Sequence, residues 1–269
     1  YTPLHIVEKS YEQLTKILGK NWQSRYILWD MCCGVGNLEV KHSNYRNIFM
    51  STLDVADVKV MKASHTCVGA NIFQYDYLND DIDDFGNIDY NITKKLPVEL
   101  RNAINDSRNG KKGAKKILVL INPPYAEAMN VNNITNINNN SDLKKGVAQT
   151  NIGMNMSDLG YASRELFIQF LVRIQNELPN AILAMSSTLK YINSKNFTKF
   201  RENWRAKYLG GFIVHSQAFD GLTGHFPIGF LQWDLKKKEK CKEMITTVLD
   251  ETGSIIGEKS FFPNPDYPP

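Results

Sequence analysis

Residues 116–125, with the sequence KILVLINPPY, constrain the fold of this chain more than any other stretch. Residues 117–121 are five consecutive apolar residues, and three of them are β-branched. A short apolar run of this kind is typical of a strand that is buried on both faces, as in a parallel sheet. Ligands of open α/β sheets lie beyond the carboxyl ends of the strands, so chemistry is expected at Asn122.

The tetrapeptide Asn122, Pro123, Pro124 and Tyr125 is suited to holding an amino group. The two prolines remove two backbone donors, so the carbonyl groups here remain available as acceptors. Asn122 adds an amide oxygen, and Tyr125 adds a flat face on which a heteroaromatic ring can stack. An exocyclic amino group that donates to Asn122 and to the Pro123 carbonyl would turn its lone pair towards an electrophile. The alternative is an ordinary turn, because Asn-Pro and Pro-Pro are common in loops.

Length and composition predict one α/β domain with short appendages. The chain has 269 residues, of which 42% are hydrophobic, which is enough for a large core. It contains neither a run of 18 apolar residues nor a signal-peptide pattern at its N-terminus, so we expect a cytoplasmic protein. The net charge of +4 permits a basic face against phosphates but does not by itself predict nucleic-acid binding.

The four cysteines predict reduced thiols. Cys32, Cys33, Cys67 and Cys241 form no CxxC pair and no regular framework, which argues against structural zinc and against disulfides. We expect no metal site.

The first residues predict a capped helix. Apolar residues recur with helical spacing from residue 4 to residue 18, Thr2 is expected as the N-cap, Pro3 as the first helical residue and Gly19 as the end.

A glycine-containing turn follows the first predicted strand, residues 26–29. Asp30 ends the strand, and Gly34 and Gly36 allow backbone amides to approach a ligand as the chain turns into a helix. A Rossmann nucleotide loop is the competing interpretation. Its GxGxxG pattern fails here, because Glu39 stands at the third glycine position.

Two further strands are predicted to end in acids. Residues 48–54 end at Asp54, about two dozen residues after Asp30, which is the spacing at which a carboxylate meets a ribose diol. Asp57 is a rival, and a helix N-cap is the alternative role for either. Residues 71–78 lead to Asp76.

The remaining segments extend the α/β pattern. Residues 79–115 are predicted to form a surface excursion, with a returning helix near residues 96–104. Residues 126–160 are predicted to form an Asn-rich mobile loop. This loop is either a lid over the substrate or an insertion without function. A helix over 164–174 and a strand over 181–185 follow. Residues 212–214 and 228–233 predict an antiparallel pair at the sheet edge, and residues 250–253 a turn between short strands.

The order of three motifs resembles one enzyme family. Tyr1-Thr2-Pro3 comes first, the loop after Asp30 next, and Asn-Pro-Pro-Tyr later. Over residues 1–233 this resembles the γ-class DNA adenine-N6 methyltransferases of bacterial restriction-modification systems, which use S-adenosylmethionine. The resemblance implies a Rossmann-like class I methyltransferase fold: a mostly parallel twisted sheet with an antiparallel edge and helices on both faces.

The resemblance also implies roles for particular residues. Catalysis is assigned to Asn122, Pro123, Pro124 and Tyr125. Binding of S-adenosylmethionine is assigned to Tyr1, Thr2, Pro3, Asp30, Met31, Cys32, Gly34, Gly36, Asn37, Asp54, Val55, Asp76, Tyr77 and Asn122. Packing on the target base is assigned to Tyr125, Phe226 and Phe219, although either phenylalanine could belong to the core instead. The chain departs from the family's loop at Met31, where proline is usual.

The implied partner is double-stranded DNA with the target adenine flipped out of the stack. Residues 1–235 would form the catalytic domain and residues 236–269 a C-terminal extension. The family's recognition domain is not found after the last strand, so we expect a separate recognition domain or subunit, and weak, salt-sensitive DNA binding without it. The alternatives are an N-methyltransferase acting on ribosomal RNA adenine or on a protein glutamine, or a catalytically silent DNA-binding subunit.

Overall fold

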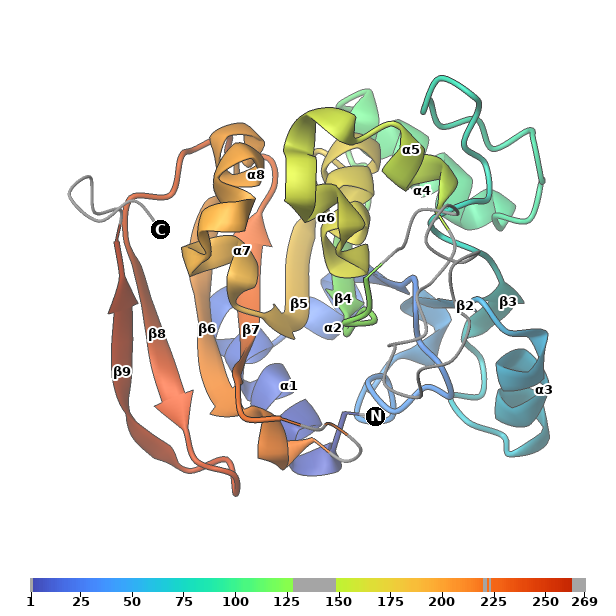
Figure 1. Ribbon diagram of the computed structural model, residues 1–269. Coiled ribbons are helices and arrows are strands. Elements are labelled where there is room, and N and C mark those ends of the chain that lie inside the picture. The colour runs from blue at the N-terminus through green and yellow to red at the C-terminus, as the bar shows by residue number, and fades with distance from the viewer. Residues whose placement is uncertain (1, 128–148, 220–221, 223, 263–269) are drawn as a thin grey trace, which may run out of the picture.

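The structure, a computed structural model, describes residues 2–127, 149–219, 222 and 224–262. These residues form one nine-stranded sheet with the order β3-β2-β1-β4-β5-β7-β6-β8-β9 (Figure 1). The strands are β1 (Tyr26–Asp30), β2 (Ile48–Thr52), β3 (Asn71–Gln74), β4 (Lys116–Ile121), β5 (Ile182–Thr188), β6 (Lys207–His215), β7 (Pro227–Asp234), β8 (Met244–Leu249) and β9 (Ile255–Phe261).

Helices cover both faces of the sheet (Figure 1). One face carries α1 (Leu4–Leu18), α2 (Trp22–Arg25) and α3 (Val55–Ala63). The other carries α4 (Val98–Arg108), α5 (Asn151–Met154), α6 (Leu166–Glu177), α7 (Lys190–Asn193) and α8 (Thr198–Asn203). Short 3₁₀ helices complete the described chain: η1 (Tyr45–Asn47), η3 (Ser157–Arg164), η4 (Lys195–Phe197) and η5 (Ser216–Ala218). None of the helices in the described ranges is both long and apolar enough to cross a membrane.

The strand directions confirm the predicted fold class. Strands β3, β2, β1, β4 and β5 are parallel, and β7 runs antiparallel between β5 and β6. The β6–β7 pair is therefore antiparallel as predicted, but its expected place at the edge is wrong. Strand β8 pairs with β6 and β9 pairs with β8, so the C-terminal residues extend the sheet beyond it. The predicted turn at residues 250–253 joins these two strands.

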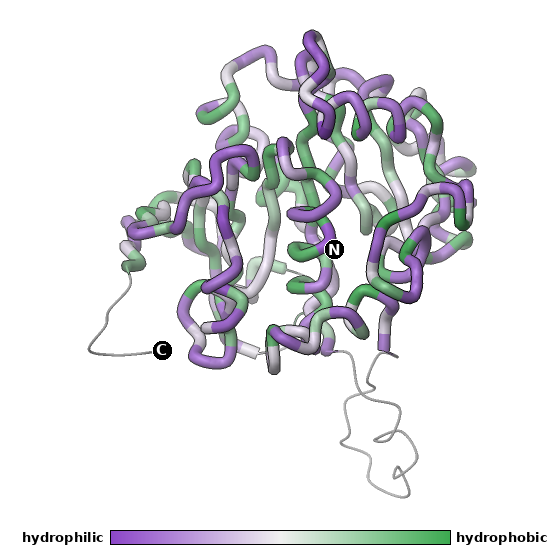
Figure 2. Tube along the Cα trace, turned by 90° about the horizontal axis from the view of Figure 1, so that it is seen from above, coloured by the Kyte–Doolittle hydropathy of each residue, from purple (hydrophilic) through white to green (hydrophobic). Residues whose placement is uncertain are grey.

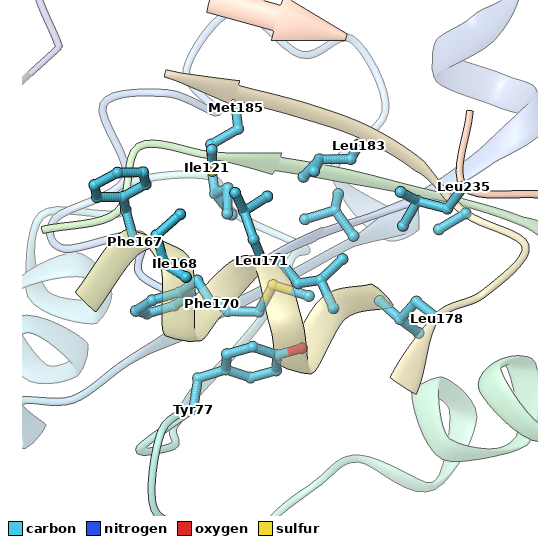
Figure 3. Close-up of a cluster of buried hydrophobic side chains, with 14 of the residues drawn as sticks. Tyr77, Ile121, Phe167, Ile168, Phe170, Leu171, Leu178, Leu183, Met185 and Leu235 are labelled. Atoms are coloured by element: carbon cyan, nitrogen blue, oxygen red, sulfur yellow. The ribbon is translucent and has the colours of Figure 1, made fainter. Parts of the chain in front are cut away.

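Apolar packing on each face fixes the sheet between its helices. Figure 2 shows apolar stretches along the strands in the interior and polar stretches along the outer segments. Strand β4 lies in the middle of this core, and its residues from Ile117 to Ile121 are at most 2% exposed. In Figure 3, side chains of α6 such as Leu171 point towards Ile121 of β4 and Leu183 of β5. The central apolar run thus forms the buried strand that the sequence predicts.

A buried ion pair within α6 is hydrogen-bonded to residues that follow β3 in the sequence. Arg173 and Glu177 are fully buried, with Nε of Arg173 3.3 Å from Oε2 of Glu177. The Tyr77 and Tyr90 hydroxyls donate to Glu177 at 2.6 and 2.8 Å, and Arg173 donates to the Tyr75 hydroxyl at 2.8 Å and to the Tyr77 carbonyl. Residues 79–115 were expected to form a surface excursion. The start of this segment is instead anchored to the core, because Asp81 is fully buried and the Tyr90 hydroxyl donates to the buried Glu177.

Two expectations about helix termini are wrong. Helix α1 begins at Leu4 with Pro3 as its N-cap and has no side-chain cap, so Thr2 is not the cap and Pro3 is not a helical residue. Gly19 does end the helix, with a φ of 86°. The helix expected after the glycine turn is absent, because residues 34–41 form successive turns.

The segment expected to be an Asn-rich loop is only partly described. Residues 128–148 lie outside the described residues. Of the remainder, residues 151–154 form α5 and residues 157–164 form η3, so this part is helical where a loop was expected. The returning helix predicted near residues 96–104 is confirmed as α4.

We predict that Glu177→Ala lowers the free energy of unfolding by about 3–5 kcal/mol, because it leaves the buried Arg173 charge without its partner. Urea denaturation followed by circular dichroism measures this value. Glu12→Ala is the control, since it breaks the exposed Lys9–Glu12 pair, whose atoms are 2.9 Å apart. That change is expected to cost less than about 1 kcal/mol. Equal losses in the two variants would contradict the structural role of the buried pair.

Candidate functional site

The predicted site residues gather at the carboxyl ends of the parallel strands. Thr52 of β2 and Gln74 of β3 are register partners, so Asp54 and Asp76 each lie two residues beyond the same level of the sheet. Asn122 directly follows β4, and β4 pairs with β1, which ends at Asp30. Figure 1 shows the start of α1 and the end of β6 at this same edge. The sheet therefore brings four distant polar residues to one edge.

The turn after β1 is held by short local hydrogen bonds. Asp30 accepts from the Cys32 amide at 2.8 Å, and the Cys33 amide donates to the Ser51 carbonyl at 3.0 Å. Gly34 and Gly36 have φ values of 54° and 87°, which favour glycine. A Cβ atom at Gly36 would lie 2.8 Å from Cε of Met50, whereas a Cβ at Gly34 would meet nothing within 4 Å. The turn is thus packed at Gly36 and open at Gly34, where a ligand can approach the backbone.

Glu39 is a second buried carboxyl group close to Asp30. Asp30 is 1% exposed and Glu39 is fully buried. Neither oxygen of Glu39 has a hydrogen-bond partner among the described residues, and the Asp30 carboxyl group is close enough to influence the charge of Glu39. A buried carboxyl group without a partner is disfavoured in its charged form, and the more so beside a second carboxyl group. Asp30 is stabilised as an acceptor by the Cys32 amide, whereas Glu39 has no such donor.

Burial sets the titration of this pair. It raises the pKa of Asp30 from its ordinary value of 3.8 to about 6, against the lowering effect of the hydrogen bond from the Cys32 amide. Burial, reinforced by the neighbouring Asp30 charge, also raises the pKa of Glu39 well above its ordinary value. The folded protein therefore binds more protons than the unfolded chain once the pH exceeds about 4. Stability from this pair is greatest at low pH and is lost as the pH rises through 6 and beyond.

The acids after β2 and β3 have local partners but keep acceptor capacity. Asp54 is exposed and caps α3, since its Oδ1 accepts from the Ala56 amide at 2.7 Å. Its other carboxylate oxygen has no partner among the described residues. Asp76 accepts from the Leu78 amide at 3.1 Å and from the Asn79 side chain at 2.8 Å. Asp57, the rival of Asp54, accepts from the Thr52 hydroxyl at 3.0 Å.

Asn122 is held on both sides of its amide group. Its Nδ2 donates to Oγ1 of Thr2 at 2.9 Å, and its Oδ1 accepts from the Tyr125 hydroxyl at 2.6 Å. Burial raises the pKa of the Tyr125 phenol, so this hydroxyl keeps its proton and acts as a donor. The Asn122 amide oxygen therefore points at a hydrogen-bond donor, the Tyr125 hydroxyl.

Other predicted site residues lie elsewhere. Met31 is 1% exposed, and its side chain is in the core. Tyr77, expected to bind the cofactor, is 2% exposed, because its ring is buried between Trp29 and Phe170. Phe219 is 4% exposed and takes the core role.

The remaining predicted residues stay near the edge or outside the described chain. Phe226 and Tyr125 are half-buried and pack against the same apolar cluster. Cys32 and Asn37 lie in the turn, and Val55 begins α3 and is 51% exposed. Tyr1 lies outside the described residues.

The donors and acceptors at this edge fit a nucleoside-bearing cofactor such as S-adenosylmethionine. The amides of Gly34 and Val35 have no hydrogen-bond partner among the described residues, so they can donate to a polar ligand. The free oxygen of Asp54 can accept from a ribose hydroxyl, and Asp76 can accept from an amino group. No cluster of His, Cys, Asp or Glu suited to a metal ion occurs in the part of the chain that the structure describes.

A cavity of about 560 Å³ lies away from this edge. Its lining combines aromatic residues such as Tyr191, Trp204 and Trp233 with polar and charged ones, near the start of β5 and β6. Its position at the opposite ends of the strands separates it from the residues after β1, β2, β3 and β4.

Sequence reasoning missed three features of the site. Glu39 was considered only as the residue that breaks the GxGxxG pattern. No sequence pattern placed its carboxyl group beside Asp30, nine residues earlier. The Thr2–Asn122 contact spans 120 positions and leaves no local signal. The Arg173–Glu177 pair was detectable as two opposite charges four residues apart in a helix with many apolar residues.

Comparison with known proteins gives matches among solved structures. No protein-family model and no curated protein sequence matches the chain. The ATP-dependent Type ISP restriction-modification enzyme LlaBIII bound to DNA is 10% identical, with a TM-score of 0.59 over 98% of this chain and 22% of that one. The DrdV–DNA complex is 16% identical, with a TM-score of 0.59 over 99% of this chain and 30% of that one.

A third structure is a separate subunit. The type I restriction-modification system methyltransferase subunit from Streptococcus thermophilus is 15% identical, with a TM-score of 0.53 over 92% of this chain and 47% of that one. At these identities the likeness establishes the fold: this chain has the mixed α/β fold found in restriction-modification enzymes. It spans less than half of each of these three chains.

We predict that Glu39→Gln flattens the pH dependence of thermal stability. Glutamine is neutral like the protonated Glu39, so the variant and the original protein are expected to melt at similar temperatures at pH 5. At pH 8 the variant is expected to melt several degrees higher. The buried Glu39 side chain costs stability at a pH far above the ordinary pKa of glutamate, whereas glutamine does not titrate. Scanning calorimetry across this pH range is the measurement, with exposed Glu12→Gln as the control. The same dependence of melting temperature on pH in the protein and in Glu39→Gln would show that the pKa of Glu39 is not raised by burial.

Proposed function

We propose that this chain is the catalytic part of a restriction-modification DNA methyltransferase that transfers a methyl group from S-adenosylmethionine to N6 of adenine. The observation that carries the proposal is the juxtaposition of an open glycine turn with the Asn122 amide oxygen at one edge of the sheet. An amine-binding acceptor beside a nucleoside-binding edge is the arrangement that this reaction requires.

The cofactor would be held by residues after β1, β2 and β3. The free amides of Gly34 and Val35 suit the methionine part, Asp54 suits the ribose diol, and Asp76 suits the adenine amino group. When bound, S-adenosylmethionine supplies a methyl group that is already activated by a positively charged sulfur.

The residues after β4 would hold the target amine. The Asn122 amide oxygen and the Pro123 carbonyl accept its two N–H groups, so its lone pair points away from both acceptors. The Tyr125 ring, half-buried next to Asn122, offers a stacking face for the purine. No covalent nucleophile is involved, since orientation of the amine supplies much of the rate. Tyr125 and Phe226 would flank the base, and Phe219 is left out because it is buried.

DNA is the proposed substrate on two grounds. Two of the matched structures are complexes with DNA. The adenine must leave the stack to reach Asn122, at a cost of a few kcal/mol that contacts in the site offset. Because this chain spans less than half of each matched chain, sequence recognition is assigned to a separate domain or subunit.

We predict that Asn122→Ala lowers the rate of methyl transfer to unmethylated DNA by on the order of 100-fold, since it removes an acceptor aimed at the reacting amine. The measurement is incorporation of tritiated methyl groups into DNA, RNA and protein fractions in parallel. Asn203→Ala, at an exposed asparagine of α8, is the control and is expected to keep full activity.

Each fraction in this experiment decides between functions. Label found only in the RNA or the protein fraction would show that RNA or protein, and not DNA, is the substrate. Absence of label from all fractions, with a chain that is folded and binds the cofactor, would favour a catalytically silent subunit. Label in DNA that survives Asn122→Ala would remove Asn122 from the reaction.

We predict that Asp54→Asn weakens binding of S-adenosylmethionine by roughly tenfold, because a charged acceptor to the ribose hydroxyls is lost. Asparagine caps helices as well as aspartate does, so α3 is expected to keep its stability. Asp57→Asn is the matched control, three residues away, and is expected to change the Kd little. Isothermal titration calorimetry measures both. A larger effect at Asp57 than at Asp54 would transfer the ribose role to Asp57.

A further inference from the structure

The Asn122 amide is gripped by residues from two distant parts of the chain. Tyr125 lies three positions away, and Thr2 lies 120 positions away at the start of the described chain. Thr2 is 5% exposed, so its contact with Asn122 is largely shielded from water. A buried side-chain contact of this kind restricts how the amide can rotate.

The two distances identify which end of the amide faces which partner. The contact with Tyr125 is 2.6 Å, which is normal for an O–H···O hydrogen bond and short for N–H···O. The contact with Thr2 is 2.9 Å, the usual N–H···O distance. Oδ1 therefore points to Tyr125 and Nδ2 points to Thr2, and a rotation of the amide by 180° would fit both distances less well.

Thr2 is free to serve Asn122 because it does not cap the helix. Pro3 precedes α1, and its carbonyl accepts from the amides of Ile6 and Val7, both at 3.0 Å. Ile6 and Val7 are fully buried against the sheet. Packing of the first turn of α1 therefore places the Thr2 hydroxyl at the end of β4.

We propose that Thr2 is a positioning residue that holds the Asn122 amide with its oxygen towards the target amine. The proposal rests on the proposed function. In the free protein the Tyr125 hydroxyl occupies the position of that amine, as a donor to the same oxygen. When the base enters, its amino group replaces the hydroxyl, while Thr2 keeps Nδ2 turned away. Without Thr2 the amide can rotate and present N–H groups to an amine that is itself a donor.

The test compares Thr2→Val with Thr2→Ser. Valine has nearly the shape of threonine but no acceptor, so kcat for methyl transfer to DNA is expected to fall by on the order of tenfold. The KM values for DNA and for S-adenosylmethionine are expected to stay near those of the original protein. Serine keeps the hydroxyl and is expected to restore most of kcat. Thr2→Ala replaces Thr2→Val if valine prevents folding, as judged by circular dichroism.

A second readout uses the free protein and does not depend on activity. The side-chain NH₂ signals of Asn122 are assigned in a ¹⁵N-asparagine-labelled sample by their loss in Asn122→Asp. We expect Thr2→Val to shift these signals and to speed their exchange with water, and Thr2→Ser to leave them nearly unchanged.

The outcomes separate this proposal from the proposed function. Unchanged NH₂ signals in Thr2→Val, or a raised KM for S-adenosylmethionine at unchanged kcat, would overturn the positioning role and make Thr2 a cofactor contact or a bystander. Shifted signals in a chain that transfers no methyl group would support the positioning of Asn122 and would reject the proposed function.

Discussion

The parallel pairing of β1 with β4 is the constraint on which the rest of the structure depends. It places the turn after Asp30 and the tetrapeptide after Ile121 side by side at one edge, although about 90 residues separate them in the sequence. Both strands are almost completely buried, so neither can shift its register without exposing apolar side chains. The relation between the glycine turn and Asn122 is therefore fixed by the hydrophobic core.

Buried polar groups refine this arrangement where packing alone is not specific. The Arg173–Glu177 pair attaches the segment that contains Asp76 to α6, and the Glu39 carboxyl group supports Asp30. Buried charges cost free energy unless they are satisfied, so the Arg173–Glu177 pair requires one particular geometry of its neighbours. Both the pair and Glu39 lie directly behind a predicted cofactor residue. The site is thereby supported by groups that do not themselves reach the ligand.

Local patterns in the sequence predicted the fold class and most of the strands, because a buried strand and the residue that ends it are adjacent in the chain. The positions of Asp54 and Asn122 followed from this. Tyr77 was misjudged, because its side-chain direction depends on a partner, Glu177, that is 100 positions away. Thr2 was misjudged for the same reason, since its partner is Asn122 and not the adjacent helix. Contacts between distant segments are set by tertiary packing and leave no local pattern.

A crystal structure of the chain with S-adenosylhomocysteine tests the central claim most directly. The account predicts that the ligand lies across the carboxyl ends of β1, β2 and β3. Its ribose hydroxyls are expected within hydrogen-bond distance of Asp54, and its sulfur is expected on the side of Asn122. Binding in the aromatic cavity beside Trp204 and Trp233, or a ligand whose sulfur is remote from Asn122, would contradict it.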